Sequence, residues 1–371
     1  MASRLSQWGN DLYTGKRSYD IVGNRRRWYA ISLVILVLSA GFLATRQLNP
    51  SIDFRGGAEF TVTGVEDTAQ QPAIDAVASV DAEEIPRVSV VGGSAMRVQT
   101  GDLDDTQVRE VVQALAAAYD VPENEVSSSF VGPTWGKDVT GKALRGLVIF
   151  LLLVSVVMTL YFRAWRMAAA ALVALAHDLV ITVGLYAGIG WEVSPATVIG
   201  FLTILGYSLY DTVVVFDKVR ENTDKVTEQK RFTYAEMANL AVNQTLVRSI
   251  NTSIVALLPV GAILFIGAFL LGAGTLRDIA LALFIGMAVG TFSSIFIATP
   301  FEVTLRQREP AIAAHTERVL AARAQAAQAG GDATATGAPP VVVGAVMPGA
   351  HLGTRAQPKR RKPNRPSGRQ S

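Results

Sequence analysis

Long apolar stretches alternate with short polar ones along most of the chain. An α-helix needs about 20 apolar residues to cross the hydrocarbon core of a bilayer. We predict membrane-spanning helices at 28–47, 142–162, 167–190, 194–217, 246–271 and 278–304. The first is too long for the apolar core of a signal peptide and lacks a small-residue cleavage pattern after it, so we expect it to be retained. The pattern predicts a polytopic α-helical membrane protein and excludes a soluble enzyme.

The segment between the first two predicted spans, residues 48–141, is too polar for a bilayer and predicts a folded domain outside it. Apolar and polar residues alternate around Phe60 and again around Met96, as expected of strands with one buried face. The pair Gly92-Gly93 indicates a hairpin turn before the second of these strands. Two helices are predicted at 73–80 and 108–119, the second capped by Asp102 or Asp104, and a last strand at 126–131. The resulting order, strand-helix-strand-strand-helix-strand, is the split βαβ arrangement of an α+β domain.

Lysine and arginine gather in alternate connections between the predicted spans. Arg25–Arg27 precede the first span, and the connections at 163–166 and 218–231 are also basic. The opposite connections, 190–193 and 272–278, together hold a single basic residue. Because short basic loops stay in the cytoplasm, both termini are expected to be cytoplasmic and residues 48–141 extracytoplasmic. The remaining segments are a cytoplasmic N-terminus at 1–27, a cytoplasmic loop at 218–245 and a cytoplasmic tail at 305–371, mostly disordered after an alanine-rich helix at 311–330.

Composition agrees with a membrane location. Hydrophobic residues make up 50% of the chain and charged residues 18%, whereas a soluble domain carries about 25% charged residues. The net charge of +3 comes from short basic blocks that mark cytoplasmic loops, so we expect no nucleic-acid partner. The chain contains no cysteine, which excludes disulfides, thiolate metal sites and cysteine nucleophiles.

No segment predicts a nucleotide, metal or hydrolase site. Residues 132–137 resemble a phosphate-binding loop, but one residue is missing between the glycines and Asp138 stands where Ser or Thr would bind magnesium. The three histidines lack the spacing of a zinc site. We therefore predict no cofactor and no enzyme activity, and any work must draw its energy from a partner or an ion gradient.

Three ionisable residues lie within or at the edge of predicted spans. Asp178 follows His177 midway along the third span, Asp211 lies in the fourth, and Arg248 opens the fifth. Such residues cost about 2.5–3.5 kcal/mol at the centre of a membrane helix and are functional candidates by default. The fourth and fifth spans are antiparallel neighbours in sequence, so Asp211 and Arg248 are expected to approach each other. The pair is either a static ion pair that fixes helix register or part of a proton pathway.

Two pairs of glycines have the spacing that lets membrane helices pack closely. Gly184 and Gly188 lie in the third span, and Gly286 and Gly290 in the sixth. Packing within the chain and packing against a second subunit both account for them, and we expect a second subunit to use these faces.

Five segments match a known family. They are Ser51–Gly57 (SIDFRGG), Val131–Lys137, His177-Asp178, Gly206–Asn222 and Gln244–Arg248. Together they resemble the SecF family, the SecD/SecF half-sized relatives of the proton-driven RND exporters, in the form typical of actinobacteria. The matching motif residues are Asp53, Arg55, Gly56, Gly57, Gly206, Tyr207, Ser208, Asp217, Arg220, Asn222 and Gln244. The chain departs from the pattern at Tyr210, where many members have Asn, and at Asn251 and Ser253, which thin the Ser/Thr run after Arg248.

The resemblance implies a multi-pass subunit of the bacterial cytoplasmic membrane that pairs with SecD. In the family, the two subunits form a twelve-span, proton-driven accessory to the SecYEG channel and pull preproteins outward. The resemblance assigns the proton relay to Asp211 and Arg248. Asp178 is then either a second relay station or a polar group in helix packing.

Three other functions are compatible with parts of the pattern. Half of an RND-like small-molecule exporter is one, although RND pumps have twelve spans and two large outer domains. An intramembrane aspartyl protease is a second, but Ala176-His177-Asp178 lacks the Gly-x-Gly-Asp motif that such proteases need. A third is a translocon scaffold that works independently of protons.

Overall fold

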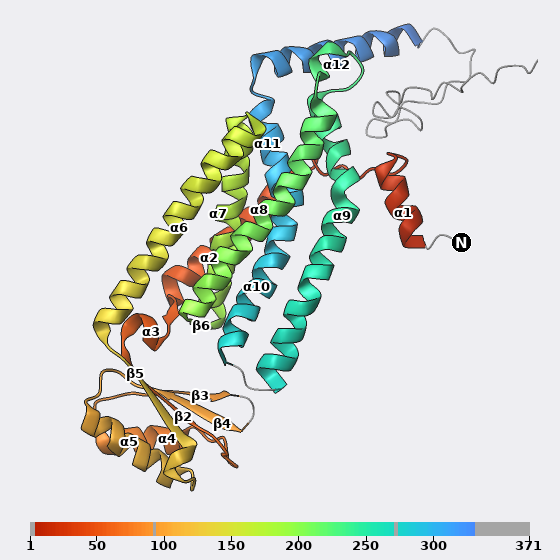
Figure 1. The fold of residues 1–371 in the computed structure, drawn as a ribbon. Helices are drawn as coiled ribbons and strands as arrows, with labels where there is room; N and C mark the ends of the chain where they lie inside the picture. Colours follow the sequence, from red (N-terminus) through yellow and green to blue (C-terminus); the bar gives the residue numbers. More distant parts are fainter. Residues whose placement is uncertain (1–3, 92–93, 271–273, 331–371) are drawn as a thin grey trace, which may run out of the picture.

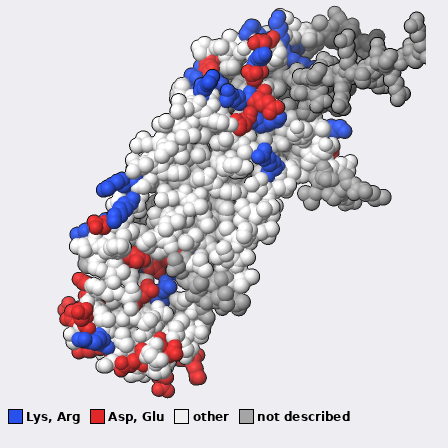
Figure 2. Space-filling model, viewed as in Figure 1, with Lys and Arg blue, Asp and Glu red and all other residues white. Residues whose placement is uncertain are grey.

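The computed structural model describes residues 4–91, 94–270 and 274–330. A bundle of long helices carries one small sheet domain at one end (Figure 1). We call this end the sheet end, and the opposite end, where α11 (Thr299–Arg306) and α12 (Pro310–Gly330) lie, the tail end. On the face shown in Figure 2, charged residues gather toward the two ends and a broad uncharged belt lies between them. This distribution fits a protein that crosses a bilayer along the bundle axis.

Within the described residues, six helices are long and apolar enough to cross a membrane. They are α2 (Arg25–Arg46), α6 (Pro133–Phe162), α7 (Trp165–Ile189), α8 (Pro195–Thr223), α9 (Tyr234–Ala262) and α10 (Gly274–Ser293). Two of them continue as π-helices, α9 into η3 (Ile263–Leu270) and α10 into η4 (Ser294–Ala298), and η4 leads into α11. The prediction of six membrane helices is thereby confirmed.

Several helices extend beyond the predicted spans. Helix α6 begins at Pro133 rather than at 142, so the end of the predicted outer domain is helical. The predicted loop at 218–245 shortens to residues 224–233, which hold only the short η2 (Val226–Glu228), because α8 runs to Thr223 and α9 starts at Tyr234. The helices are longer than the predicted spans because hydropathy marks only the part of a helix that suits hydrocarbon, whereas a helix continues wherever its backbone hydrogen bonds do.

The sheet domain has the predicted split βαβ order. Its elements are β2 (Gly57–Val62), α4 (Gln71–Val80), β3 (Arg87–Val91), β4 (Ala95–Gln99), α5 (Asp105–Ala118), η1 (Glu123–Glu125) and β5 (Val126–Val131). The strands lie in the order β3-β4-β2-β5 and every neighbouring pair is antiparallel. The predicted glycine turn at 92–93 lies outside the described residues. Helices α4 and α5 cover one face of the sheet, where Phe60, Met96 and Leu115 are fully buried (Figure 1).

The cap of α5 is Asp104 rather than Asp102. Its carboxylate accepts hydrogen bonds from the backbone amides of Thr106 and Gln107, each at 2.8 Å, and the Gln107 side chain accepts from the Asp104 amide. This reciprocal capping box satisfies two donors that the helix itself leaves unpaired. Asp104 is therefore placed by helix-end chemistry.

The N-terminal segment is folded onto the bundle, which the sequence analysis missed. It contains a helix, α1 (Arg4–Tyr13), followed by a stretch held by two asparagines of α9. The Asn239 side-chain oxygen accepts from the amides of Ile21 and Val22 at 2.9 and 3.0 Å, and that of Asn243 accepts from the Tyr19 amide at 2.7 Å. Residues 4–27 are thus a structural part of the tail end.

The alanine-rich segment of the tail forms the predicted helix, α12. Arg323 pairs with Glu236 at the start of α9 at 2.7 Å, and the His315 ring lies 2.7 Å from the carbonyl oxygen of Gln229. Residues 331–371, expected to be disordered, lie outside the described residues. Helix α12 therefore covers the short connection between α8 and α9.

All four predicted packing glycines contact other helices of the same chain. A methyl group on Gly184 or Gly188 would meet Ser39 or Phe42 of α2, and one on Gly286 or Gly290 would meet Ile204 or Ser208 of α8. The expectation that a second subunit uses these faces is wrong, because close approach within the bundle already fills them.

Candidate functional site

Asp178 lies at the meeting point of three helices and is only 1% exposed. One of its carboxylate oxygens accepts hydrogen bonds from Ser208 of α8 at 2.6 Å and from Ser293 of α10 at 2.8 Å. The other oxygen lies 3.1 Å from Nδ1 of His177, the preceding residue. Both oxygens of the Asp178 carboxylate therefore have a polar partner in the interior of the bundle.

Asp211 lies on α8 one turn beyond Ser208 and is 4% exposed. Its Oδ2 accepts a short hydrogen bond from the Ser294 hydroxyl. Ser293 and Ser294 are consecutive, so two adjacent serines bind the two buried aspartates. The two carboxylates thereby belong to one polar cluster, which we define as Asp178, Asp211, Ser208, Ser293 and Ser294.

The backbone around the two serines suits this arrangement. Ser293 ends α10 and Ser294 begins the π-helix η4. Neighbouring residues of an α-helix point about 100° apart, so consecutive serines reach separate targets. Single-turn π-helices are rare and occur often at functional sites. Gly290 adds to the geometry, because a Cβ there would lie 3.0 Å from Ser208 Cβ; the glycine lets α8 and α10 come close.

No Lys or Arg pairs with either aspartate among the residues that the structure describes. Serine hydroxyls take that place instead. A hydroxyl donates to an ionised carboxylate and can rotate to accept from a protonated one, so both protonation states find a partner in the cluster. The arrangement can take up and release a proton without stranding a buried polar group.

Arg248 does not contact Asp211, so the predicted approach of these two residues is wrong. Helix α9 turns Thr245, Ser249 and Ser253 toward the interior. Arg248, about 100° around the helix from Ser249, is exposed and forms no ion pair within the described parts of the chain. Neighbouring spans in sequence were correctly paired, since α8 packs on α9, but the rotation of α9 about its axis was not predictable from the apolar pattern.

Of the residues around Ser208 in the fourth-span motif, one joins the hydroxyl network and the others do not. Tyr207 donates from its hydroxyl to Ser253 of α9 at 3.3 Å, and Thr291 of α10 donates to the same serine at 2.7 Å. Gly206 has open space where a Cβ would lie, and Tyr210 is 54% exposed. Tyr207 thus extends the hydroxyl network toward α9, whereas Tyr210 faces away from Asp211 and has no contact with the cluster.

The rest of the motif braces the tail end. The Tyr161 hydroxyl donates to Asp217 at 3.0 Å, and Arg220 donates to the Tyr161 carbonyl oxygen at 3.3 Å. Asn222 donates to the Gln244 side chain at 2.9 Å, which in turn donates to the carbonyl oxygen of Tyr13 at 3.3 Å. These contacts join α6, α8, α9 and the N-terminal segment, and they lie apart from the polar cluster.

The segment with the double glycine shapes the entry to the sheet domain. Ser51 precedes the short helix α3 (Ile52–Arg55), and its hydroxyl donates to Asp53 at 3.1 Å. Gly56 and Gly57 have φ angles of 84° and 128°, which L side chains rarely adopt. A Cβ on Gly57 would also lie 2.3 Å from the Thr100 carbonyl oxygen. Two glycines are therefore needed where α3 turns into β2; Arg55, the last residue of α3, is exposed.

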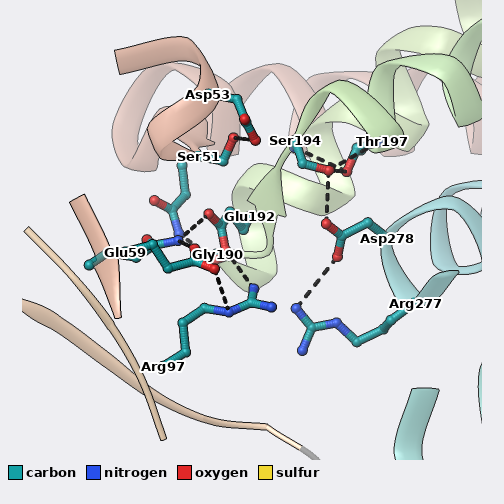
Figure 3. A network of polar contacts seen from close by, with 12 residues as sticks. Ser51, Asp53, Glu59, Arg97, Gly190, Glu192, Ser194, Thr197, Arg277 and Asp278 are labelled. Atoms are coloured by element: carbon teal, nitrogen blue, oxygen red, sulfur yellow. Dashed lines mark hydrogen bonds and ion pairs between the residues drawn. The ribbon is translucent and has the colours of Figure 1, made fainter. Parts of the chain in front are cut away.

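A polar junction ties the sheet domain to the bundle (Figure 3). The strand β1 (Asn49–Pro50) pairs in parallel with β6 (Glu192–Val193) in the connection between α7 and α8. The Gln99 amide donates to Glu59 at 2.9 Å and to Glu192 at 2.7 Å. Arg97 lies 3.5 Å from Glu59 and 3.7 Å from Glu192. Strand alternation places these residues of β2 and β4 on the face of the sheet opposite its apolar core.

Burial raises the pKa of Glu192 above its ordinary value, and the carboxylates of Glu59 and Asp278 act in the same direction. The hydrogen bond from Gln99 and the charge of Arg97 oppose this rise. The junction therefore contains two carboxylates that share one guanidinium and one amide.

Three groups of functional interest were not predicted from the sequence. Ser293 and Ser294 could have been identified from the sequence, because they are two adjacent hydroxyl residues inside an apolar span. Glu302 is fully buried, accepts from the Tyr234 hydroxyl at 2.7 Å and lies 3.5 Å from Arg306. The sequence feature that could have indicated this pair is the spacing of Glu302 and Arg306, four residues apart on one helix. No sequence feature indicated the junction between the sheet domain and the bundle, because its residues come from strands far apart in sequence.

The chain matches two families of known proteins. One, described as "Protein export membrane protein SecD/SecF, C-terminal", matches residues 111–308, and the other, "SecD/SecF GG Motif", matches residues 41–64. Protein translocase subunit SecF of Streptomyces coelicolor is 48% identical over 328 residues, which cover 88% of this chain and 87% of the relative. Protein translocase subunit SecF of Mycobacterium tuberculosis (strain H37Rv) is 41% identical over 88% of this chain and 75% of the relative.

Two solved structures resemble the fold. The crystal structure of SecDF, a translocon-associated membrane protein from Thermus thermophilus, matches with a TM-score of 0.66 and 32% identity over 79% of this chain. SecDF in its super-membrane-facing form matches with a TM-score of 0.57 and 29% identity over 84% of this chain. The chain spans 39% and 40% of the length of these SecDF chains.

Proposed function

Because the chain belongs to the SecD/SecF family of protein export membrane proteins, we propose that it is a SecF-like subunit of the Sec preprotein translocase. With SecD it uses the proton gradient to promote export of preproteins through the SecYEG channel. The observation that carries this proposal is the polar cluster, in which hydroxyls hold two buried aspartates and, among the described residues, no Lys or Arg pairs with either. Such a cluster suits reversible protonation within a membrane.

A SecD partner is supported by the fused relatives. SecDF of Thermus thermophilus holds in one chain the part that resembles this protein together with a longer remainder. In our proposal a separate SecD chain supplies that remainder. The two subunits then form the twelve-span assembly expected of the family.

Arg248 supports the same partnership. An arginine exposed on a membrane helix is costly unless a carboxylate or water reaches it. Exposed Ile254 and Val255 follow it along α9, so its surroundings are suited to another helix rather than to bulk water. We propose that SecD covers this face and brings an acidic group to Arg248, and that Asp211, Asp178 and Arg248 together form the proton relay.

Copurification tests the proposal directly. The tagged full chain, extracted in a mild detergent, is expected to retain SecD, and SecY in smaller amounts, as detected by mass spectrometry of digested eluates. Arg248→Gln is expected to reduce retained SecD several-fold, whereas the control Arg145→Gln, an exposed charge on α6, leaves it unchanged. Isolation of the chain as a folded protein that retains no SecD would overturn the proposed partnership.

The proposed orientation places the sheet domain outside the cell and both termini in the cytoplasm. The chain has no cysteine, so single cysteines report position without background. Ser128→Cys, exposed on β5, is expected to react with a membrane-impermeant maleimide in intact cells. Thr227→Cys, exposed between α8 and α9, is expected to react only after the cells are permeabilised. The reverse labelling pattern would show the opposite orientation.

A further inference from the structure

A hollow of about 240 Å³ lies at the tail end, where α6 ends and α7 begins. Its lining includes four arginines, one glutamate and a tryptophan: Arg163, Arg166, Arg220, Arg306, Glu309 and Trp165. Four positive charges against one negative charge make this lining strongly basic. We call it the arginine pocket.

Two of the arginines are already committed to the fold. Glu309 accepts from Arg166 at 2.6 Å and from Arg306 at 2.8 Å, and Arg306 also lies 3.5 Å from Glu302. Arg163 and Arg220 are exposed and form no ion pair among the residues that the structure describes. Arg220 also donates from Nη1 to the Tyr161 carbonyl oxygen at 3.3 Å. A guanidinium has five N–H donors, so Arg163 and Arg220 keep donors for an anion.

The pocket lies at a membrane boundary. Residues 163–164 connect two candidate spans, which end at Phe162 and begin at Trp165. Trp165 is 60% exposed, and the Arg166 guanidinium lies 4.9 Å from the centre of its ring. Tryptophan is enriched where the apolar core of a bilayer meets its headgroups. The pocket is thus placed at headgroup level, whichever side of the membrane it faces.

An apolar surface runs from the pocket along α6. Leu153, Val156, Val157 and Leu160 are 52–71% exposed on the last turns before the pocket. A soluble anion would use only the arginines, whereas a phospholipid would also cover this surface with its acyl chains. The two features are adjacent on one helix end.

We propose that the arginine pocket binds the phosphate headgroup of an anionic phospholipid, whose acyl chains lie along α6. Arg163 and Arg220 hold the phosphate oxygens, since the planar fork of a guanidinium matches phosphate geometry with two parallel hydrogen bonds. The bound lipid bridges the α6–α7 turn to α8. It is a site apart from the polar cluster and the sheet-domain junction.

Native mass spectrometry of the purified full chain in detergent measures this binding. Phosphatidylglycerol is compared with phosphatidylcholine of the same acyl chains and with inorganic phosphate. The double variant Arg163→Gln/Arg220→Gln is expected to bind phosphatidylglycerol about 25-fold more weakly, because each basic residue near an anionic lipid contributes a factor of about five. The matched control, Lys142→Gln/Arg145→Gln, removes two exposed charges from the sheet end of α6 and is expected to bind as the unmodified chain does.

Three outcomes would overturn the proposal. Equal affinity for the two lipids would show that the pocket does not recognise the charge of the headgroup. Equal affinity of the double variant and the unmodified chain would show that the lipid binds elsewhere. If millimolar inorganic phosphate competes for the pocket as strongly as phosphatidylglycerol does, the pocket binds a soluble anion. If the double variant does not purify as a folded protein, the two single variants, each expected to bind about five-fold more weakly, give the same decision.

Discussion

Replacing Asp211 by Asn is expected to leave the protein in the membrane at near-normal levels while the proton-gradient-dependent part of preprotein export falls at least about tenfold. Asn keeps the size of Asp and an oxygen that accepts from Ser294, but it cannot exchange a proton. No arginine is stranded by the change, because Arg248 is exposed and does not pair with Asp211. Immunoblotting of membranes and export of a reporter preprotein, with and without a protonophore, measure the two quantities.

Asp178→Asn is expected to have the same phenotype. Its two serine hydroxyls can reorient toward an amide, although the His177 contact at 3.1 Å is lost or inverted. Asp217→Asn is the matched control, since Asp217 is exposed, belongs to the same motif as Asp211 and contacts only Tyr161 among the described polar contacts. Normal gradient-dependent export in the Asp211 and Asp178 variants would reject the relay and favour a proton-independent scaffold. Loss of the protein from the membrane would instead assign the aspartates a structural role.

The sequence predicted the parts of the fold that follow from local periodicity. The six apolar stretches and the strand-helix order of the sheet domain each come from spacing within 20 residues or fewer. Phe60 and Met96 were placed on the buried face because alternation alone decides which face a strand residue takes. The cap of α5 was narrowed to Asp102 or Asp104 because a capping residue lies directly before the first turn of its helix.

The polar cluster depended on information that is not local. Hydropathy ranks Asp178 and Asp211 as costly, but it does not give the rotation of each helix about its axis. That rotation turns Arg248 outward and brings Ser293 and Ser294 inward. Serine is common in membrane helices, where it bonds back to its own helix, so a pair of serines is a weak signal until the opposing aspartates are placed.

Replacing Arg97 by Met is expected to loosen the sheet domain from the bundle at neutral pH. Met fills a similar volume but leaves Glu59 and Glu192 facing each other with only the Gln99 amide between them. Removing one partner of a buried ion pair costs about 3–5 kcal/mol; we expect the lower end, because the side chains here are 16–24% exposed. Thermal unfolding of the purified full chain, together with limited proteolysis near residue 48, measures the loss.

The pH dependence of the same variant has a definite sign. Because burial raises the pKa of Glu192 in the folded protein, the folded state holds its proton more tightly than the unfolded chain. This contribution to stability is fully present below the ordinary pKa of a glutamate and is lost as the pH rises through the higher folded value. Arg97 lowers that folded pKa, so Arg97→Met raises it further and widens the pH range over which stability falls.

Melting temperatures at pH 5 and pH 8 separate this effect from the other titrating groups. The fall in melting temperature from pH 5 to pH 8 is expected to be larger for Arg97→Met than for the unmodified chain. For Glu192→Gln this fall is expected to be smaller. In the double variant Arg97→Met/Glu192→Gln, the neutral amide no longer repels Glu59, so much of the stability lost at pH 8 is expected to return. An Arg97→Met protein as stable at pH 8 as the unmodified chain, or a Glu192→Gln protein with an unchanged pH dependence, would show that the junction does not hold the sheet domain through these charges.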